Sequence, residues 1–128
     1  MEEKYFAEAE RLALVNSTCL KIKTGAVIVK KGKTIGRGWN LCSPEGFKHG
    51  QKVGKCPRFG LKTGENYELC KPIHAEVMAI LNTGLKNCRG ATMYLSGHWY
   101  ACWHCQSLAY LAGIKEIKVK DKKTKNFW

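Results

Sequence analysis

The 128-residue sequence contains only 3 prolines, only 10 acidic residues against 22 lysines and arginines, and no long apolar run. Without about 18 consecutive apolar residues it offers no candidate membrane span. The acidic start Met1–Lys4 has no signal-peptide-like segment behind it, so we expect a cytoplasmic protein. The sequence also lacks internal repeats and low-complexity segments. With 45% hydrophobic residues, residues 1–128 are predicted to form a single domain around one core.

The shortage of acidic residues leaves a formal net charge of +12. Such a charge favours an anionic substrate or partner but does not identify it. Six lysines lie between residues 115 and 125, where a solvated charged face is the commoner explanation.

Cysteine is abundant by comparison, with seven residues. An odd number of cysteines without an export signal indicates free thiols and metal ligands rather than disulfides. Cys88 stands apart from the other six and is expected in the core.

Two short motifs carry chemistry: His74-Ala75-Glu76 and Cys102-Trp103-His104-Cys105. Zinc binds imidazole nitrogen and thiolate sulfur in tetrahedral geometry, and a site with three protein ligands keeps its fourth position for water. His74, Cys102 and Cys105 supply three ligands. Glu76 is then available as a general acid and base. Three metal ligands and one free carboxylate are the groups that a zinc hydrolase requires.

Two other interpretations of these motifs remain open. His104 could complete a closed structural zinc site, or the two cysteines could be a buried thiol pair. Glu76 argues against both, because a structural metal does not require a neighbouring carboxylate.

Each motif is predicted to lie at the start of a helix. Apolar residues recur at helical spacing after both motifs, and Asn82–Gly84 and Gly113 are typical stops. The predicted apolar positions are Val77, Ile80 and Leu81 in the first helix and Leu108, Leu111 and Ala112 in the second. Positive helix ends favour thiolate over thiol and so favour metal binding.

The remaining pattern predicts alternating helices and strands. An opening helix should bury Tyr5, Phe6, Ala9, Leu12 and Ala13. Strands are predicted over 26–29, 34–39, 91–95 and 114–119, with a hairpin turn at 31–33. The order α, β, β, α, β, α, β predicts an α/β fold, a three-layer α/β/α sandwich around a mixed sheet of four to five strands.

The chain resembles the cytidine deaminase superfamily, and within it the deoxycytidylate (dCMP) deaminase group. His-x-Glu followed by Cys-x-x-Cys is the signature of zinc nucleobase deaminases. The likeness extends over most of residues 5–119. The segments that carry it are 17–19, 24–29, 36–40, 56–58, 64–70 and 73–76.

This resemblance implies hydrolytic deamination of a cytosine nucleotide, dCMP or CMP, to dUMP or UMP and ammonia. Zinc hydroxide would attack C4 while Glu76 shuttles protons. It also implies substrate contacts from the Ala75 amide, from Asn40 to the sugar, and from a carbonyl near Tyr100 or Ala101 to the amine. Asn40 has a second interpretation, as a turn former after a strand.

The sequence departs from the family pattern around the expected pocket. Ala101 replaces a proline, Met78 an asparagine and Leu41 a glycine, and the loop containing Trp99 is longer and more aromatic than usual. These changes are compatible with a modified or unusual substrate.

A second, structural zinc is predicted for the long segment 41–71 and its surroundings. Its candidate ligands are Cys19, Cys42, Cys56, Cys70 and His49. The alternative is free thiols packed as small hydrophobic groups.

Rival functions are also open. The substrate could be a base in RNA or single-stranded DNA, stacked on Trp99, Tyr100 and Trp103, or another free nucleobase or nucleoside. A non-catalytic zinc module is a third possibility. The resemblance implies a homo-oligomer, and four tryptophans in so small a domain are compatible with burial between subunits.

Overall fold

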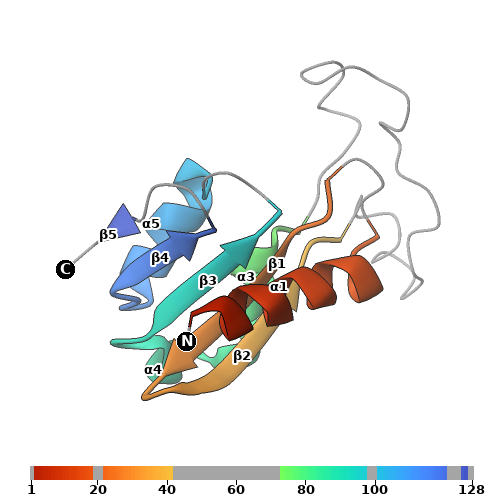
Figure 1. The fold of residues 1–128 in the computed structure, drawn as a ribbon. Helices are drawn as coiled ribbons and strands as arrows, with labels where there is room; N and C mark the ends of the chain where they lie inside the picture. The colour runs from red at the N-terminus through yellow and green to blue at the C-terminus, as the bar shows by residue number, and fades with distance from the viewer. Residues whose placement is uncertain (1, 19–21, 42–72, 98–100, 121–124, 127–128) are drawn as a thin grey trace.

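A computed structural model of the protein describes residues 2–18, 22–41, 73–97, 101–120 and 125–126 (Figure 1). Its helices are α1 (Glu3–Asn16), α3 (Ala75–Thr83), α4 (Leu85–Cys88) and α5 (Trp103–Leu111). Its strands are β1 (Gly25–Lys30), β2 (Lys33–Trp39), β3 (Thr92–Ser96), β4 (Glu116–Val119) and β5 (Lys125–Asn126). No helix in these ranges has the length and apolar character needed to cross a membrane.

The five strands form one mixed sheet in the order β2-β1-β3-β4-β5. β1 pairs antiparallel with both β2 and β3, β3 pairs parallel with β4, and β4 pairs antiparallel with β5. The parallel pair is joined by α5, as expected because parallel strands need a crossover connection. The predicted mixed sheet is confirmed.

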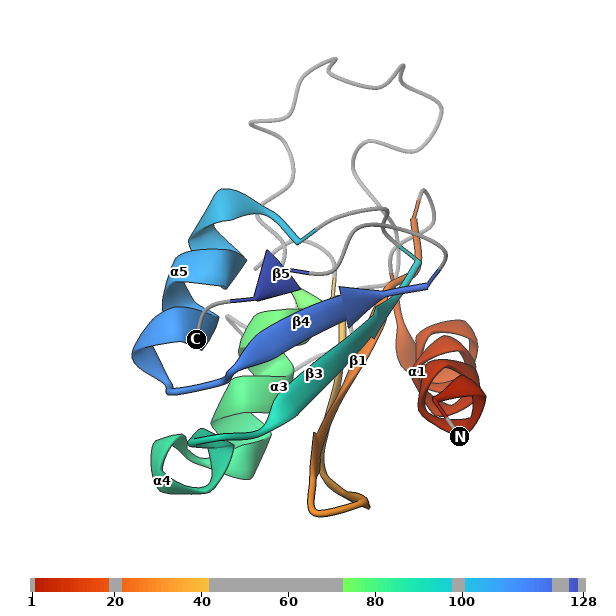
Figure 2. The same ribbon diagram turned by 60° about the vertical axis from the view of Figure 1, so that its left-hand side comes forward.

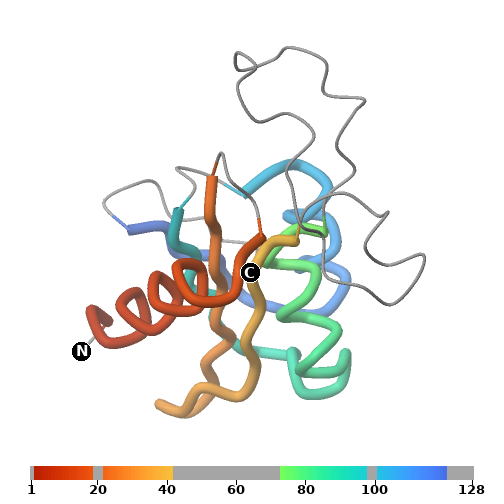
Figure 3. Tube along the Cα trace, turned by 90° about the vertical axis from the view of Figure 1, so that its right-hand side faces the viewer, coloured from red at the N-terminus to blue at the C-terminus, as the bar shows by residue number. Residues whose placement is uncertain are grey.

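Helices cover both faces of the sheet (Figures 2 and 3). α1 lies on one face, while α3 and α5 lie together on the other. The three-layer α/β/α arrangement predicted from the sequence is therefore confirmed.

The core follows the two-residue period of β1. Ala26 and Ile28 belong to the cluster on the α3 and α5 side, whereas Val27 and Val29 pack towards α1. Because both faces of β1 are covered, the strand has a continuous apolar run instead of an alternating one. Tyr5, Phe6 and Leu12 of α1 pack on Val27, Val29 and Tyr94, as the helical period predicts.

Glycine allows α3 to approach β2 closely. A Cβ built at Gly38 would lie 2.4 Å from the carbonyl oxygen of Ala75 and 2.4 Å from the nitrogen of Ala79. These are backbone atoms of α3, so no side chain larger than hydrogen fits between strand and helix. The contact at Gly38 therefore sets the distance between β2 and the start of α3.

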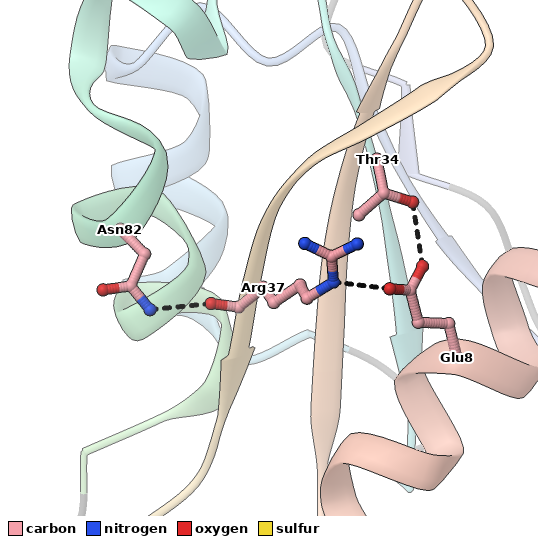
Figure 4. A network of polar contacts seen from close by, with 4 residues as sticks. All are labelled: Glu8, Thr34, Arg37 and Asn82. Carbon is pink, nitrogen blue, oxygen red and sulfur yellow. Dashed lines mark hydrogen bonds and ion pairs between the residues drawn. The ribbon is translucent and has the colours of Figure 1, made fainter.

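A polar network ties the three layers together at β2 (Figure 4). The Arg37 side chain donates from Nε to Glu8 of α1 at 2.5 Å, and Thr34 Oγ1 donates to the same carboxylate at 2.8 Å. Asn82 of α3 donates from Nδ2 to the Arg37 carbonyl at 2.8 Å. β2 is thereby held to both flanking helices.

Two residues of the predicted apolar stripes are exposed in the structure. Leu81 is 73% exposed and Leu111 is 79% exposed, although the helices containing them are present. The contact at Gly38 brings Ala75 and Ala79 of α3 against β2. The buried residues of α3 are Ala75, Glu76, Ala79, Ile80 and Thr83. α4 has no counterpart in the prediction, and the fifth strand that the prediction allowed was given no residues. Four and two residues are too few to show periodicity.

Candidate metal centre

His74, Cys102 and Cys105 meet in space. Among the described residues they form a cluster in which the ligand atoms all lie within 4.8 Å of one another. The His74 Nδ1 atom is 3.5 Å from the Cys102 sulfur and 3.4 Å from the Cys105 sulfur. One imidazole nitrogen thus faces both thiols.

These separations fit zinc. With Zn–N of about 2.0–2.1 Å and Zn–S of about 2.3 Å at tetrahedral angles, a ligating nitrogen and sulfur lie about 3.5 Å apart. Both nitrogen-to-sulfur distances match that value, so His74 and each cysteine have the separation that zinc ligands require. Three protein ligands leave a fourth position for water.

Both halves of the cluster lie at helix N-termini, as predicted. His74 is the N-cap of α3, and Cys102 is the N-cap of α5. The Cys105 backbone N–H donates to the Cys102 sulfur at 3.4 Å. Unpaired N–H groups and the positive helix end favour the thiolate form that a metal requires.

The site lies at one end of the sheet because of the chain order. α5 follows the carboxyl end of β3, and α3 is the next described helix after the carboxyl end of β2. Crevices beyond the carboxyl ends of strands are common ligand sites in α/β folds.

Glu76 lies in the first turn of α3 and is only 5% exposed. It is not a member of the three-residue cluster, so it is not required as a ligand. The pKa of the Cys105 thiol is raised well above its usual range, mainly because the thiol is buried. The negative charge of Glu76 and the neighbouring Cys102 raise this pKa further. A divalent cation at the cluster would reverse this balance, since it stabilises thiolate.

His104 does not join the cluster. It is exposed on the first turn of α5, and among the described residues no fourth side chain belongs to the cluster. A closed site completed by His104 is therefore not formed. Cys88 is fully buried in the core, as expected, and burial raises its pKa.

The Asn40 side chain forms hydrogen bonds within the protein. Its side-chain oxygen accepts hydrogen bonds from the Ser17 hydroxyl and from the Thr24 N–H, the latter at 2.9 Å, and its Nδ2 donates to the Ile22 carbonyl at 2.8 Å. The side chain is buried. Asn40 therefore fastens the segments on either side of residues 19–21 to the end of β2.

The other predicted substrate contacts are only partly described. Ala75 is fully buried at the first position of α3, where its N–H has no partner within the helix. Ala101 is 4% exposed, and its carbonyl accepts a hydrogen bond from Gln106 Nε2 at 2.6 Å. Sequence reasoning missed Gln106, for which the only local signal is a polar residue one helical turn after Cys102.

Several predicted residues lie outside the described ranges. These are Trp99 and Tyr100 of the pocket and all five candidate ligands of a second zinc, Cys19, Cys42, His49, Cys56 and Cys70.

Comparison with known proteins agrees with this geometry. The family model for the cytidine and deoxycytidylate deaminase zinc-binding region matches residues 1–120. The deoxycytidylate deaminase of Schizosaccharomyces pombe is 31% identical over 117 residues, which are 90% of this chain. The chain spans only 35% of that relative's length. The deoxycytidylate deaminase of Mycobacterium phage D29 is 30% identical over 122 residues, covering 90% of this chain and 91% of the phage protein.

A solved structure supports the fold. The dCMP deaminase from cyanophage S-TIM5, determined in complex with dCMP and dUMP, superimposes with a TM-score of 0.60 at 24% identity. The match covers 92% of this chain and 79% of the cyanophage chain.

Proposed function

Because the chain belongs to the zinc-binding family of cytidine and deoxycytidylate deaminases, we propose that it hydrolyses the exocyclic amine of a cytosine nucleotide. The reaction converts dCMP or CMP, with one water, into dUMP or UMP and ammonia. The observation that carries the proposal is a buried carboxylate, Glu76, beside a three-ligand cluster with zinc spacing. A purely structural metal has no need of that carboxylate.

When bound, zinc supplies Lewis-acid activation of a water molecule. Glu76 takes a proton from this water and delivers it to N3 of the ring as oxygen bonds to C4. Glu76 then carries the second proton of the water to the amine, and ammonia leaves as the C4–N bond breaks. The carboxylate ends the cycle in its starting form, so atoms and charge balance.

Three further groups are assigned to substrate binding in this proposal. The Ala75 N–H, free of a helical partner, binds the ring carbonyl, and the Ala101 carbonyl accepts from the amine. The Asn40 side chain donates one amide hydrogen to Ile22, and among the described residues its second hydrogen has no acceptor, so we assign it to a sugar oxygen. Trp99 and Tyr100 are assigned to the wall of the pocket from their place in the sequence.

The test is ammonia release from dCMP, CMP, the corresponding nucleosides and single-stranded oligonucleotides. We expect turnover of dCMP or CMP. Deamination of oligonucleotides with no reaction of free dCMP would refute the mononucleotide assignment. Absence of activity on every substrate would favour a non-catalytic zinc module.

Glu76→Gln tests the mechanism. The substitution keeps the shape but removes proton transfer, so turnover should fall by about 10²–10⁴-fold with zinc content unchanged. Glu10→Gln, at an exposed position of α1, is the matched control and should retain activity. Parental turnover in Glu76→Gln would eliminate Glu76 as the proton carrier.

Metal analysis of the same preparations tests the second zinc. One ion per chain is expected from the described cluster. Two ions per chain would support the additional site at Cys19, Cys42, Cys56, Cys70 and His49, and one ion would oppose it.

We also propose that the chain forms a homo-oligomer through its α3 and α5 layer. Leu81, Trp103 and Leu111 are each more than 70% exposed on these two helices, and large exposed apolar groups favour an interface. Light scattering should report a mass above that of one chain, and Leu111→Glu should lower it. A monomeric parent would contradict the proposal.

A further inference from the structure

Gln106 holds the two peptide groups on either side of Cys102. Its side-chain Nε2 donates to the Ala101 carbonyl at 2.6 Å, and its backbone N–H donates to the Cys102 carbonyl at 2.9 Å. One residue therefore fixes the carbonyls immediately before and within a predicted zinc ligand.

The Ala101 carbonyl does not receive the usual hydrogen bond from the backbone of α5. In a regular ladder of i to i+4 bonds its donor would be the Cys105 N–H, but that group donates to the Cys102 sulfur at 3.4 Å. Ala101 is only 4% exposed, so water is largely excluded from it. A buried carbonyl needs a partner, and Gln106 provides it.

The peptide group joining Ala101 to Cys102 is planar, so the direction of its carbonyl also sets the position of the Cys102 Cα. Rotation of this group would swing the cysteine side chain away from His74. We infer that Gln106 is a positioning residue of the metal centre, which aims the Cys102 sulfur by fixing this peptide plane. The metal part of the inference requires only the cluster, whereas its effect on turnover rests on the proposed deaminase reaction.

Two substitutions remove the contact in different ways. Gln106→Met keeps the length and volume of the side chain without a donor, and Gln106→Glu places an acceptor against the carbonyl. Asn87→Leu is the matched control. It deletes a similar amide-to-carbonyl bond, from Asn87 Nδ2 to the Thr83 oxygen at 3.0 Å, beyond the C-terminal end of α3 and away from the cluster.

The measurements are the zinc dissociation constant, by competition with a chelator, and the visible spectrum of the cobalt-substituted protein, which reports ligand geometry. Partners that orient metal ligands typically contribute 10–100-fold in metal affinity. We expect zinc affinity to fall by about 10–100-fold in both Gln106 variants, with altered cobalt bands. Asn87→Leu should match the parent in both measurements.

Parental zinc affinity and an unchanged cobalt spectrum in Gln106→Met would overturn the inference, even if thermal stability fell, because the bond would then be only structural. An equal loss of affinity in Asn87→Leu would overturn it as well. If the parent deaminated none of the nucleotides, the proposed function would fail while the metal measurements would still decide the role of Gln106. In an active parent, kcat should fall in Gln106→Met.

Discussion

The contact between Gly38 and α3 leads to a specific prediction. Gly38 is not a candidate metal ligand, yet Gly38→Ala should disturb the metal centre. The added Cβ would lie 2.4 Å from backbone atoms of Ala75 and Ala79. Non-bonded carbon contacts are normally about 3.5 Å, so β2 and α3 must separate by about 1 Å. Overpacking of this kind typically lowers the free energy of unfolding by about 1–3 kcal/mol.

The displaced atoms decide where the damage appears. Ala75 lies between His74 and Glu76, so the shift moves the proposed zinc ligand and the proposed proton carrier together. A misplacement of about 1 Å can cost about 100-fold in turnover. Zinc affinity should weaken in the same variant.

Urea unfolding, chelator competition and ammonia release measure the three effects. Gly90→Ala is the control: Gly90 has a φ of +78° and no atom within 4 Å of a Cβ built there, so only backbone strain of about 1–2 kcal/mol is expected, with parental zinc affinity. If Gly38→Ala bound zinc and turned over substrate like the parent, the close contact would not position the site, and the reasoning would be refuted.

Further predictions concern stability and pH. Asn40→Ala removes the acceptor of two buried hydrogen bonds and the donor of a partly buried one, so the free energy of unfolding should fall by about 2–4 kcal/mol in urea titrations. An unchanged value would show that Asn40 does not fasten these segments to the end of β2. Glu8→Gln should cost only about 0.2–1 kcal/mol, because the paired Arg37 side chain is 52% exposed and solvent screens the interaction; a much larger loss would show that the network is more than a surface pair. The raised pKa of Cys105 keeps its thiol protonated in the metal-free protein at neutral pH, so zinc must displace a proton. Zinc affinity should therefore decrease as pH is lowered from about 8 to 6, with protons released on binding in weakly buffered solution, and a pH-independent affinity would argue against thiolate ligation.

The predicted fold depended on patterns that are local in the chain. The apolar period of α1 and the buried run of β1 each appear within a dozen residues. α1 contains all the apolar residues expected of an opening helix, and β1 extends one residue beyond each end of the predicted strand. Gly84 ends α3 with a φ of 87°, as its place after the apolar stripe indicates. Helix starts at both motifs also follow from local sequence, which is why His74 and Cys102 could be placed at N-termini.

The exposure of Leu81 and Leu111 shows what the helical period leaves undetermined. Leu81 and Leu111 fit the helical period, but the period defines a stripe without saying how wide the buried part of it is. That width depends on what the other layer presents. Gly38 of β2 packs against Ala75 and Ala79 of α3, and Leu81 remains exposed to solvent.

The geometry of the site has the same origin. The spacing of two residues between Cys102 and Cys105 is visible in the sequence, but His74 is 28 residues before Cys102, and their approach depends on two helices packing on one sheet. Gly38 sets the distance between α3 and β2, and Gln106 fixes the orientation of the peptide group before Cys102. Neither residue type indicates zinc binding. The candidate ligands could therefore be chosen from residue types, whereas the residues that bring nitrogen and sulfur to about 3.5 Å could be found only from the packed structure. Substitutions at such supporting positions should separate metal affinity from overall stability, which substitutions of core residues such as Ile117 should not do.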